Sequence, residues 1–112
     1  MTTADDRDAE GFSVSTRREG ARGVVALVGE LDLHTADELT TAVSGLLKQK
    51  VTRVEVDAGG LSFADSAGLR AVLMARAAAV EAGATFGVTV ASGTVERLIE
   101  ITGLSDLLFD DS

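Results

Sequence analysis

The sequence predicts a single α/β domain, in which helices pack against a mixed sheet of four to five strands. Strand-like apolar runs alternate with segments of helical periodicity in the order β-β-α-β-α-β-α. With 112 residues, 46% of them hydrophobic, the chain has room for one compact core. We expect this domain at residues 11–109, between a flexible acidic tail at 1–10 and a C-terminal tail at 110–112.

The first two strands are expected on either side of a glycine turn. Residues 12–16 are typical of an edge strand, and the segment GARG at 20–23 predicts the hairpin turn. Residues 24–28 form an entirely apolar run between glycines, which predicts a strand buried on both faces. We expect the chain to leave this strand over residues 29–34.

The first helix is expected to follow Thr35. The segment TADE at 35–38 matches a capping box, in which the side chains of Thr35 and Glu38 each bond a backbone N–H at the helix start. The helical spacing of apolar residues ends at 48–50, where two lysines place positive charge at the C-terminal end of the helix. The apolar positions at helical spacing are Ala36, Leu39, Val43, Leu46 and Leu47.

The third strand is expected at residues 51–56, with Val54 and Val56 directed inward. Gly59 and Gly60 predict a turn after it, because two glycines permit a backbone path closed to other residues. The residues expected to anchor this turn to the core are Leu61 and Phe63, with Ser62 and Ala64 directed outward.

The turn brings Ser66 to the start of a second helix, expected over residues 67–82 and ended by Gly83. Gly68 lies one turn into this helix, where glycine costs about 1 kcal/mol relative to alanine. We therefore expect another reason for it, such as close approach by a partner. The apolar stripe of this helix is Leu69, Val72, Leu73 and Val80.

The remaining elements are a fourth strand at 85–90 and a short helix closed by Gly103. Residues 104–109 are apolar enough to add a last strand or to pack over the core. The face of the short helix is marked by Val95, Leu98, Ile99 and Thr102.

Composition excludes several classes of protein. The formal charge of −8 disfavours binding to nucleic acid or to an anionic membrane surface. The absence of cysteine excludes disulfides and zinc fingers. No apolar run approaches the ~20 residues that span a bilayer, and the first ten residues lack the features of a signal peptide. We expect a cytoplasmic protein.

Enzyme signatures are almost absent, so we expect no catalytic activity, no metal and no cofactor. Neither the G-x-x-x-x-G-K-[ST] loop nor G-x-G-x-x-G occurs, and His34 is the single histidine. A hydrolytic triad could use Ser66 and His34 with Asp32 or Asp65. The nucleophile elbow G-x-S-x-G is not met, however, because Ala64 stands two residues before the serine.

Two simpler interpretations of Ser66 remain. Asp65 and Ser66 both favour the N-cap position, where each is worth about 1 kcal/mol. An acidic chain with Asp-Ser at a helix start also resembles acyl carrier proteins, whose serine bears a phosphopantetheine arm. Those proteins are helical bundles with leucine after the serine, whereas this chain has strand-like runs and Ala67.

Three motifs in order carry a family resemblance: GELDLHT at 29–35, DAGGLSFADSAGLR at 57–70 and VERLIEITGL at 95–104. Together they resemble the STAS domain of bacterial anti-sigma factor antagonists, over about residues 12–109. The resemblance implies a protein that binds a serine-kinase anti-sigma factor and so frees a sigma factor. It also implies that the kinase, with its own ATP, phosphorylates the first serine of D-S-x-G, and that a serine phosphatase reverses this.

Carried onto this chain, the resemblance makes Ser66 the phosphorylation site. Asp32 matches the aspartate of the G-E-L-D loop beside the acceptor, and Asp65 the aspartate before it. Ala67 stands where the family commonly has Ser or Thr, so a second hydroxyl is missing. Arg70 stands where the family often has glycine, and this difference implies an altered choice of partner. The residues expected to bind the partner are Glu30, Asp32, Thr35, Asp65, Ala67, Gly68 and Arg70. Proline is common in the family where this chain has Gly93.

An alternative keeps the same fold and changes the function. A STAS domain can also serve as a scaffold subunit of a membrane transporter's ATPase or of a stressosome-like assembly. Ser66 would then be structural, with no phosphorylation switch.

Overall fold

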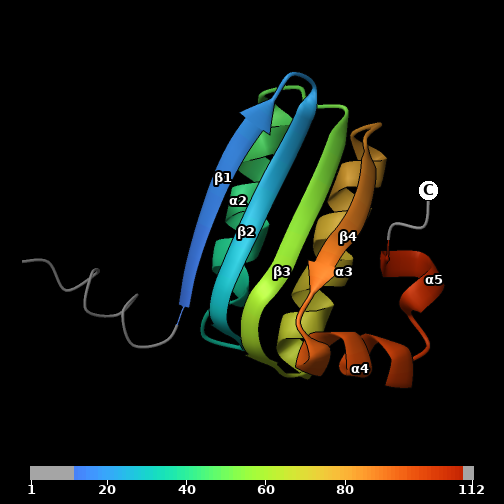
Figure 1. Cartoon of the computed structure of the whole chain (residues 1–112). Helices are drawn as coiled ribbons and strands as arrows, with labels where there is room; N and C mark the ends of the chain where they lie inside the picture. Colours follow the sequence, from blue (N-terminus) through green and yellow to red (C-terminus); the bar gives the residue numbers. More distant parts are fainter. Residues whose placement is uncertain (1–11, 110–112) are drawn as a thin grey trace, which may run out of the picture.

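The computed structural model describes residues 12–109, whose four strands form one mixed sheet in the order β1-β2-β3-β4 (Figure 1). The antiparallel pair is β1 (Phe12–Glu19) with β2 (Arg22–Leu31), and β3 (Arg53–Ala64) and β4 (Thr85–Ala91) extend the sheet in parallel. The helices are α2 (Ala36–Lys48), α3 (Ser66–Glu81), α4 (Gly93–Ile101) and α5 (Ser105–Leu108). The α/β class and the predicted order of elements are confirmed. The tails predicted at 1–10 and 110–112 lie outside the described residues.

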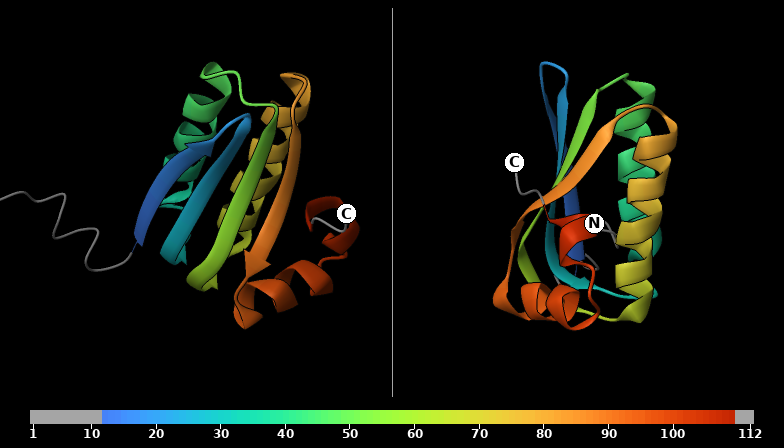
Figure 2. Two further views of the ribbon diagram at one scale, coloured as in Figure 1. Left: turned by 45° about the horizontal axis from the view of Figure 1, so that its top comes forward. Right: turned by 90° about the vertical axis from the view of Figure 1, so that its right-hand side faces the viewer.

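Helices α2 and α3 cover one face of the sheet, and within residues 12–109 no helix covers the opposite face (Figure 2). Val25 and Leu27 point to the helices and are buried, whereas Val28 is 54% exposed. The prediction that this strand is buried on both faces is therefore wrong at Val28, although Val24 is buried. The strand also continues to Leu31, beyond its predicted end.

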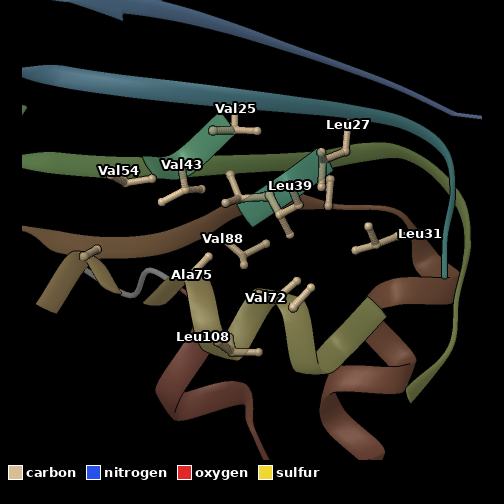
Figure 3. Packing of buried hydrophobic residues seen from close by; sticks show 14 of the residues in the cluster. Val25, Leu27, Leu31, Leu39, Val43, Val54, Val72, Ala75, Val88 and Leu108 are labelled. Carbon is tan, nitrogen blue, oxygen red and sulfur yellow. The ribbon is translucent and has the colours of Figure 1, made fainter. Parts of the chain in front are cut away.

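The core lies between the sheet and the two long helices (Figure 3). On α2 the predicted residues Leu39, Val43 and Leu46 are buried. On α3 the predicted stripe is wrong at Val80, which is 52% exposed. Alanines supply much of the buried face instead, because small side chains let α3 lie close to the sheet and to α2. The buried residues of α3 are Gly68, Ala71, Val72, Ala75 and Ala79.

The last segment packs over the core instead of adding a strand to the sheet. Leu108 of α5 is fully buried, and Phe109 forms an isolated parallel bridge with Val88 of β4. On α4 the predicted residues Val95 and Ile99 are buried. The edge of the sheet at β4 is thereby partly covered.

The predicted turn at Gly59 and Gly60 is wrong, because β3 runs through both glycines to Ala64. Neither glycine has a positive φ. A Cβ on Gly60 would lie 2.9 Å from the Leu27 carbonyl oxygen, so this glycine permits close approach of β2, where the pairing of the two strands is irregular. Past this irregularity, buried and exposed side chains no longer alternate along β3. Phe63 is therefore 44% exposed instead of anchoring the core.

Charged side chains gather at the β1–β2 hairpin end of the sheet, opposite the end from which α3 follows. Glu19 accepts hydrogen bonds from Arg17 and Arg22, and these arginines hold the pKa of the Glu19 carboxyl below its usual range. Glu55 pairs with Arg22 at 3.4 Å and with Arg53 at 2.9 Å. The pairs of Glu19 are solvent-exposed and so add little stability each.

Gly68 has an internal reason to be glycine. A Cβ at this position would lie 2.3 Å from the carbonyl oxygen of Leu31, at the end of β2. Real Cβ atoms do not come so close to a backbone atom, so only glycine lets the first turn of α3 rest on the end of β2. The close approach predicted for Gly68 is therefore made by this chain's own backbone.

We predict that Gly68→Ala destabilises the domain by about 2 kcal/mol, the cost of overpacking, although alanine favours helices. The matched control is Gly45→Ala in α2, where nothing lies within 4 Å of the added Cβ. That variant should gain up to about 1 kcal/mol. Urea denaturation of both variants measures the difference, and a Gly68→Ala protein as stable as the wild type would show that the contact is absent.

Candidate functional site

Ser66 is the first residue of α3, and its side chain is exposed. The helix is capped by its neighbour, since the Asp65 carboxylate accepts the Gly68 N–H at 2.8 Å. Within residues 12–109 the Ser66 hydroxyl makes no hydrogen bond. The capping role that the sequence allowed to either residue thus belongs to Asp65, and the Ser66 hydroxyl stays accessible to a reagent from outside.

The carbonyl group of Leu31 fixes the position of Ser66 relative to the end of β2. Leu31 pairs with Ala64 in the β2–β3 register, and its oxygen accepts the Asp65 N–H at 3.2 Å. The same oxygen lies under Gly68. Because three successive contacts hold β2 against the start of α3, the segment that follows Leu31 must lie beside Ser66.

That segment is a tight turn organised by Asp32. The Asp32 Oδ1 accepts the N–H groups of His34 at 2.9 Å and Thr35 at 3.2 Å. The Thr35 hydroxyl accepts the Asp32 N–H at 2.9 Å and donates to the Glu30 carbonyl at 2.9 Å. The Asp32 carboxylate therefore has a structural role in addition to carrying a negative charge.

The predicted capping box of α2 is wrong. Thr35 is the residue before the helix, but its side chain makes no capping hydrogen bond, and its backbone is already near helical with φ −111° and ψ −8°. The Thr35 hydroxyl turns back to Glu30 and Asp32, as described above. The backbone donors at this helix start are met by Asp32, whose carbonyl accepts the Ala36 N–H at 2.8 Å.

A groove of about 460 Å³ lies between α2 and α3, with Ser66 in its wall. Two apolar side chains there are unusually exposed, Leu33 at 72% and Met74 at 57%. Sequence analysis did not single them out, although Ser66, Arg70 and Met74 repeat at a spacing of four residues, which places them on one face of a helix. The groove is lined by Leu33, Ala36, Asp37, Thr40, Ser66, Ala67, Arg70, Ala71 and Met74.

The structure brings most of the predicted site residues to one end of the domain. Ala67 and Arg70 line the groove together with Ser66. Glu30, Asp32, Thr35 and Asp65 lie in the two joined segments described above. Gly68 differs from the others because it is buried.

The surroundings of Ser66 supply no catalytic base within hydrogen-bond distance. In the described part of the chain, no hydrogen bond joins the Ser66 hydroxyl to His34 or to a carboxylate. Among residues 12–109 no group of three histidine, aspartate or glutamate side chains is placed to hold a metal ion. The arrangement offers an exposed hydroxyl on which another protein can act.

No helix within residues 12–109 is long enough and apolar enough to cross a membrane.

Comparison with solved structures gives the same fold. An anti-sigma factor antagonist from Mycobacterium paratuberculosis superposes with a TM-score of 0.73 at 24% identity, over 91% of this chain and 88% of that one. SpoIIAA, an anti-sigma factor antagonist solved in its unphosphorylated form, gives a TM-score of 0.74 at 24% identity, over 89% of both chains. Its phosphorylated form, from Bacillus, gives 0.68 at 22% identity, over 89% of this chain and 92% of that one.

The fold also occurs as a part of a much longer chain. SLC26A9 superposes with a TM-score of 0.63 at 13% identity, over 86% of this chain but only 21% of that one. A likeness at these identities is one of fold.

Membership of a family rests on the sequence itself. A family model described as "Mlab, STAS domain" matches residues 14–109, which include all three motifs, at 29–35, 57–70 and 95–104. The match therefore spans both the G-E-L-D turn and the D-S-x-G segment that sequence analysis singled out. The chain belongs to the STAS domain family.

Proposed function

We propose that this protein is an anti-sigma factor antagonist: it binds a serine-kinase anti-sigma factor, and phosphorylation of Ser66 ends the binding. One observation carries the proposal, the exposed Ser66 hydroxyl that makes no hydrogen bond among residues 12–109 although it stands at a capped helix start. The fold shared with anti-sigma factor antagonists supports the same function.

The partners are those that the resemblance to anti-sigma factor antagonists implies, and the charge of the chain is compatible with them. The kinase supplies its own ATP, a serine phosphatase reverses the modification, and this protein acts in the cytoplasm by binding, without a cofactor or catalysis of its own. Glu30 is exposed beside the Asp32 turn, and the chain carries a charge of −8. A basic patch on the kinase opposite Glu30 and Asp32 complements their negative charge, whereas nucleic acid and anionic membranes do not.

The switch operates through charge. A phosphate on Ser66 adds about −1.5 to −2 charges at a helix N-terminus, where backbone N–H groups favour an anion, so the domain need not unfold to hold it. A partner carboxylate ~5 Å away would be repelled by roughly 3 kcal/mol per unit charge at an effective dielectric constant near 20, before screening. Since about 1.4 kcal/mol changes affinity tenfold, a large loss of binding is expected.

A second candidate function is a scaffold subunit of a transporter or of a stressosome-like assembly, in which Ser66 is never modified. One observation favours it: the same fold occurs inside SLC26A9, an SLC26 transporter. The two functions differ in whether the state of Ser66 controls binding.

Incubation with a cognate serine-kinase anti-sigma factor and ATP should place one phosphate on the chain, at Ser66, because its hydroxyl is accessible. Mass spectrometry of proteolytic peptides locates the phosphate, and Ser66→Ala should remove it. The matched control is Ser62→Ala, since Ser62 is also exposed but its hydroxyl donates to the Gly29 carbonyl at 3.2 Å. Phosphate on Ser62, or anywhere else, would contradict the assignment.

Ser66→Asp should weaken the complex with the kinase by tenfold or more, because one added negative charge approximates part of the phosphate effect. Isothermal titration calorimetry against the purified kinase measures the affinity, and Ser66→Ala serves as the neutral control. Equal affinity of the two variants would refute charge control and favour the scaffold function.

Asp32→Asn should separate the charge of this residue from its structural role. The asparagine side chain keeps the oxygen that accepts the His34 and Thr35 N–H groups, so stability should change by less than about 1 kcal/mol. Kinase binding or phosphorylation should fall about tenfold. Asp32→Ala should also lose about 1 kcal/mol of stability. Unchanged binding and phosphorylation in Asp32→Asn would show that the Asp32 carboxylate has no role in the site.

A further inference from the structure

The wall of the groove holds one basic side chain next to the modified serine. We propose that Arg70 binds the phosphate on Ser66 within the same chain, so that the modified protein contains an internal phosphoserine–arginine ion pair. This inference rests on the proposed function, because it concerns the phosphorylated state of Ser66.

The geometry of α3 places the two residues as neighbours. Ser66 and Arg70 are separated by four positions in one helix, which brings their Cβ atoms to within about 6 Å of each other. Both line the groove between α2 and α3, so their side chains point to the same side. An arginine side chain is long enough to reach a phosphate at this separation, and its planar fork of N–H donors matches the phosphate oxygens.

Arg70 is available for this contact. Its side chain is exposed, and in the described part of the chain it forms no ion pair. The other charged residue in the lining of the groove is Asp37, from α2. A phosphate carries more negative charge than the single carboxylate of Asp37 and stands on the same helix as Arg70, so the phosphate is the stronger competitor.

Two further carboxylates near Ser66 accept backbone N–H groups, and neither forms an ion pair with Arg70 in the described structure. Asp65 accepts the Gly68 N–H, and Asp32 accepts two N–H groups of its own turn. Glu30 is exposed and forms no ion pair within residues 12–109. Arg70 is therefore the cation positioned to offset the added phosphate.

The ion pair would change which hydrogen-bond donors and charges in the groove are open to a partner. In the unmodified chain the Arg70 guanidinium is open to an acidic side chain of the kinase. In the modified chain the phosphate occupies those N–H donors, so a kinase carboxylate loses its partner and meets a phosphate instead. Phosphorylation then removes one attractive contact as well as adding a repulsive one, which increases its effect on binding.

The test installs phosphoserine at position 66 during protein synthesis, which makes it independent of any kinase. Titration by ³¹P NMR gives the second pKa of the phosphate. A nearby cation favours the dianion, so this pKa should rise by about 0.3 in Arg70→Gln relative to the unsubstituted phosphoprotein. Arg70→Lys, which keeps the charge, should recover most of the difference, and 1 M salt should reduce it.

The matched control is Arg76→Gln, which removes the same charge about 15 Å from Ser66 along the axis of α3. It should leave the phosphate pKa within about 0.1, because the distance exceeds the Debye length at 0.15 M salt. Equal shifts in Arg70→Gln and Arg76→Gln would overturn the ion pair. That result would leave the proposed function intact, whereas absence of kinase phosphorylation would refute the function and leave the ion pair unaffected.

Discussion

The contact between the Leu31 carbonyl and the first turn of α3 holds the functional end of this domain together. One backbone oxygen accepts the Asp65 N–H and lies so close to Gly68 that no larger residue fits above it. Because the β2 strand ends there, the Asp32 turn must lie beside the start of α3. The site is therefore built by backbone packing, and its charged and hydroxyl side chains are placed on a surface that already exists.

This construction separates the stability of the fold from the proposed phosphorylation switch. Asp65 caps the helix, Gly68 allows the close packing, and Asp32 closes its own turn, so each contributes to the fold. The Ser66 hydroxyl makes no hydrogen bond in the described structure, and so its modification need not disrupt a contact on which the fold depends. A phosphate there changes the charge of the surface while the core between the sheet and the two long helices keeps its packing.

The sequence predicted the fold class, the order of the elements and the position of Ser66, because hydrophobic periodicity and capping residues are local signals. The capping box at Thr35 is a local failure, because that hydroxyl bonds Glu30 and Asp32 instead. The other failures arose where the answer depended on contacts between distant segments. Gly68 was assigned to a partner because Leu31 is 37 positions away. Val28 and Val80 were expected to be buried because periodicity does not reveal how many faces are covered. Leu33 was missed because its importance depends on the groove that α2 and α3 form together.

The most direct test of this account compares ¹H–¹⁵N NMR spectra of the protein with serine and with phosphoserine at position 66. A switch made of surface charge predicts that amide shifts change in the start of α3, in the Asp32 turn and along the groove. Hydrogen exchange of buried residues such as Val25, Val54 and Val88 should stay the same. Shift changes and faster exchange spread through the sheet would contradict the account, because they would mean that the phosphate acts by altering the fold.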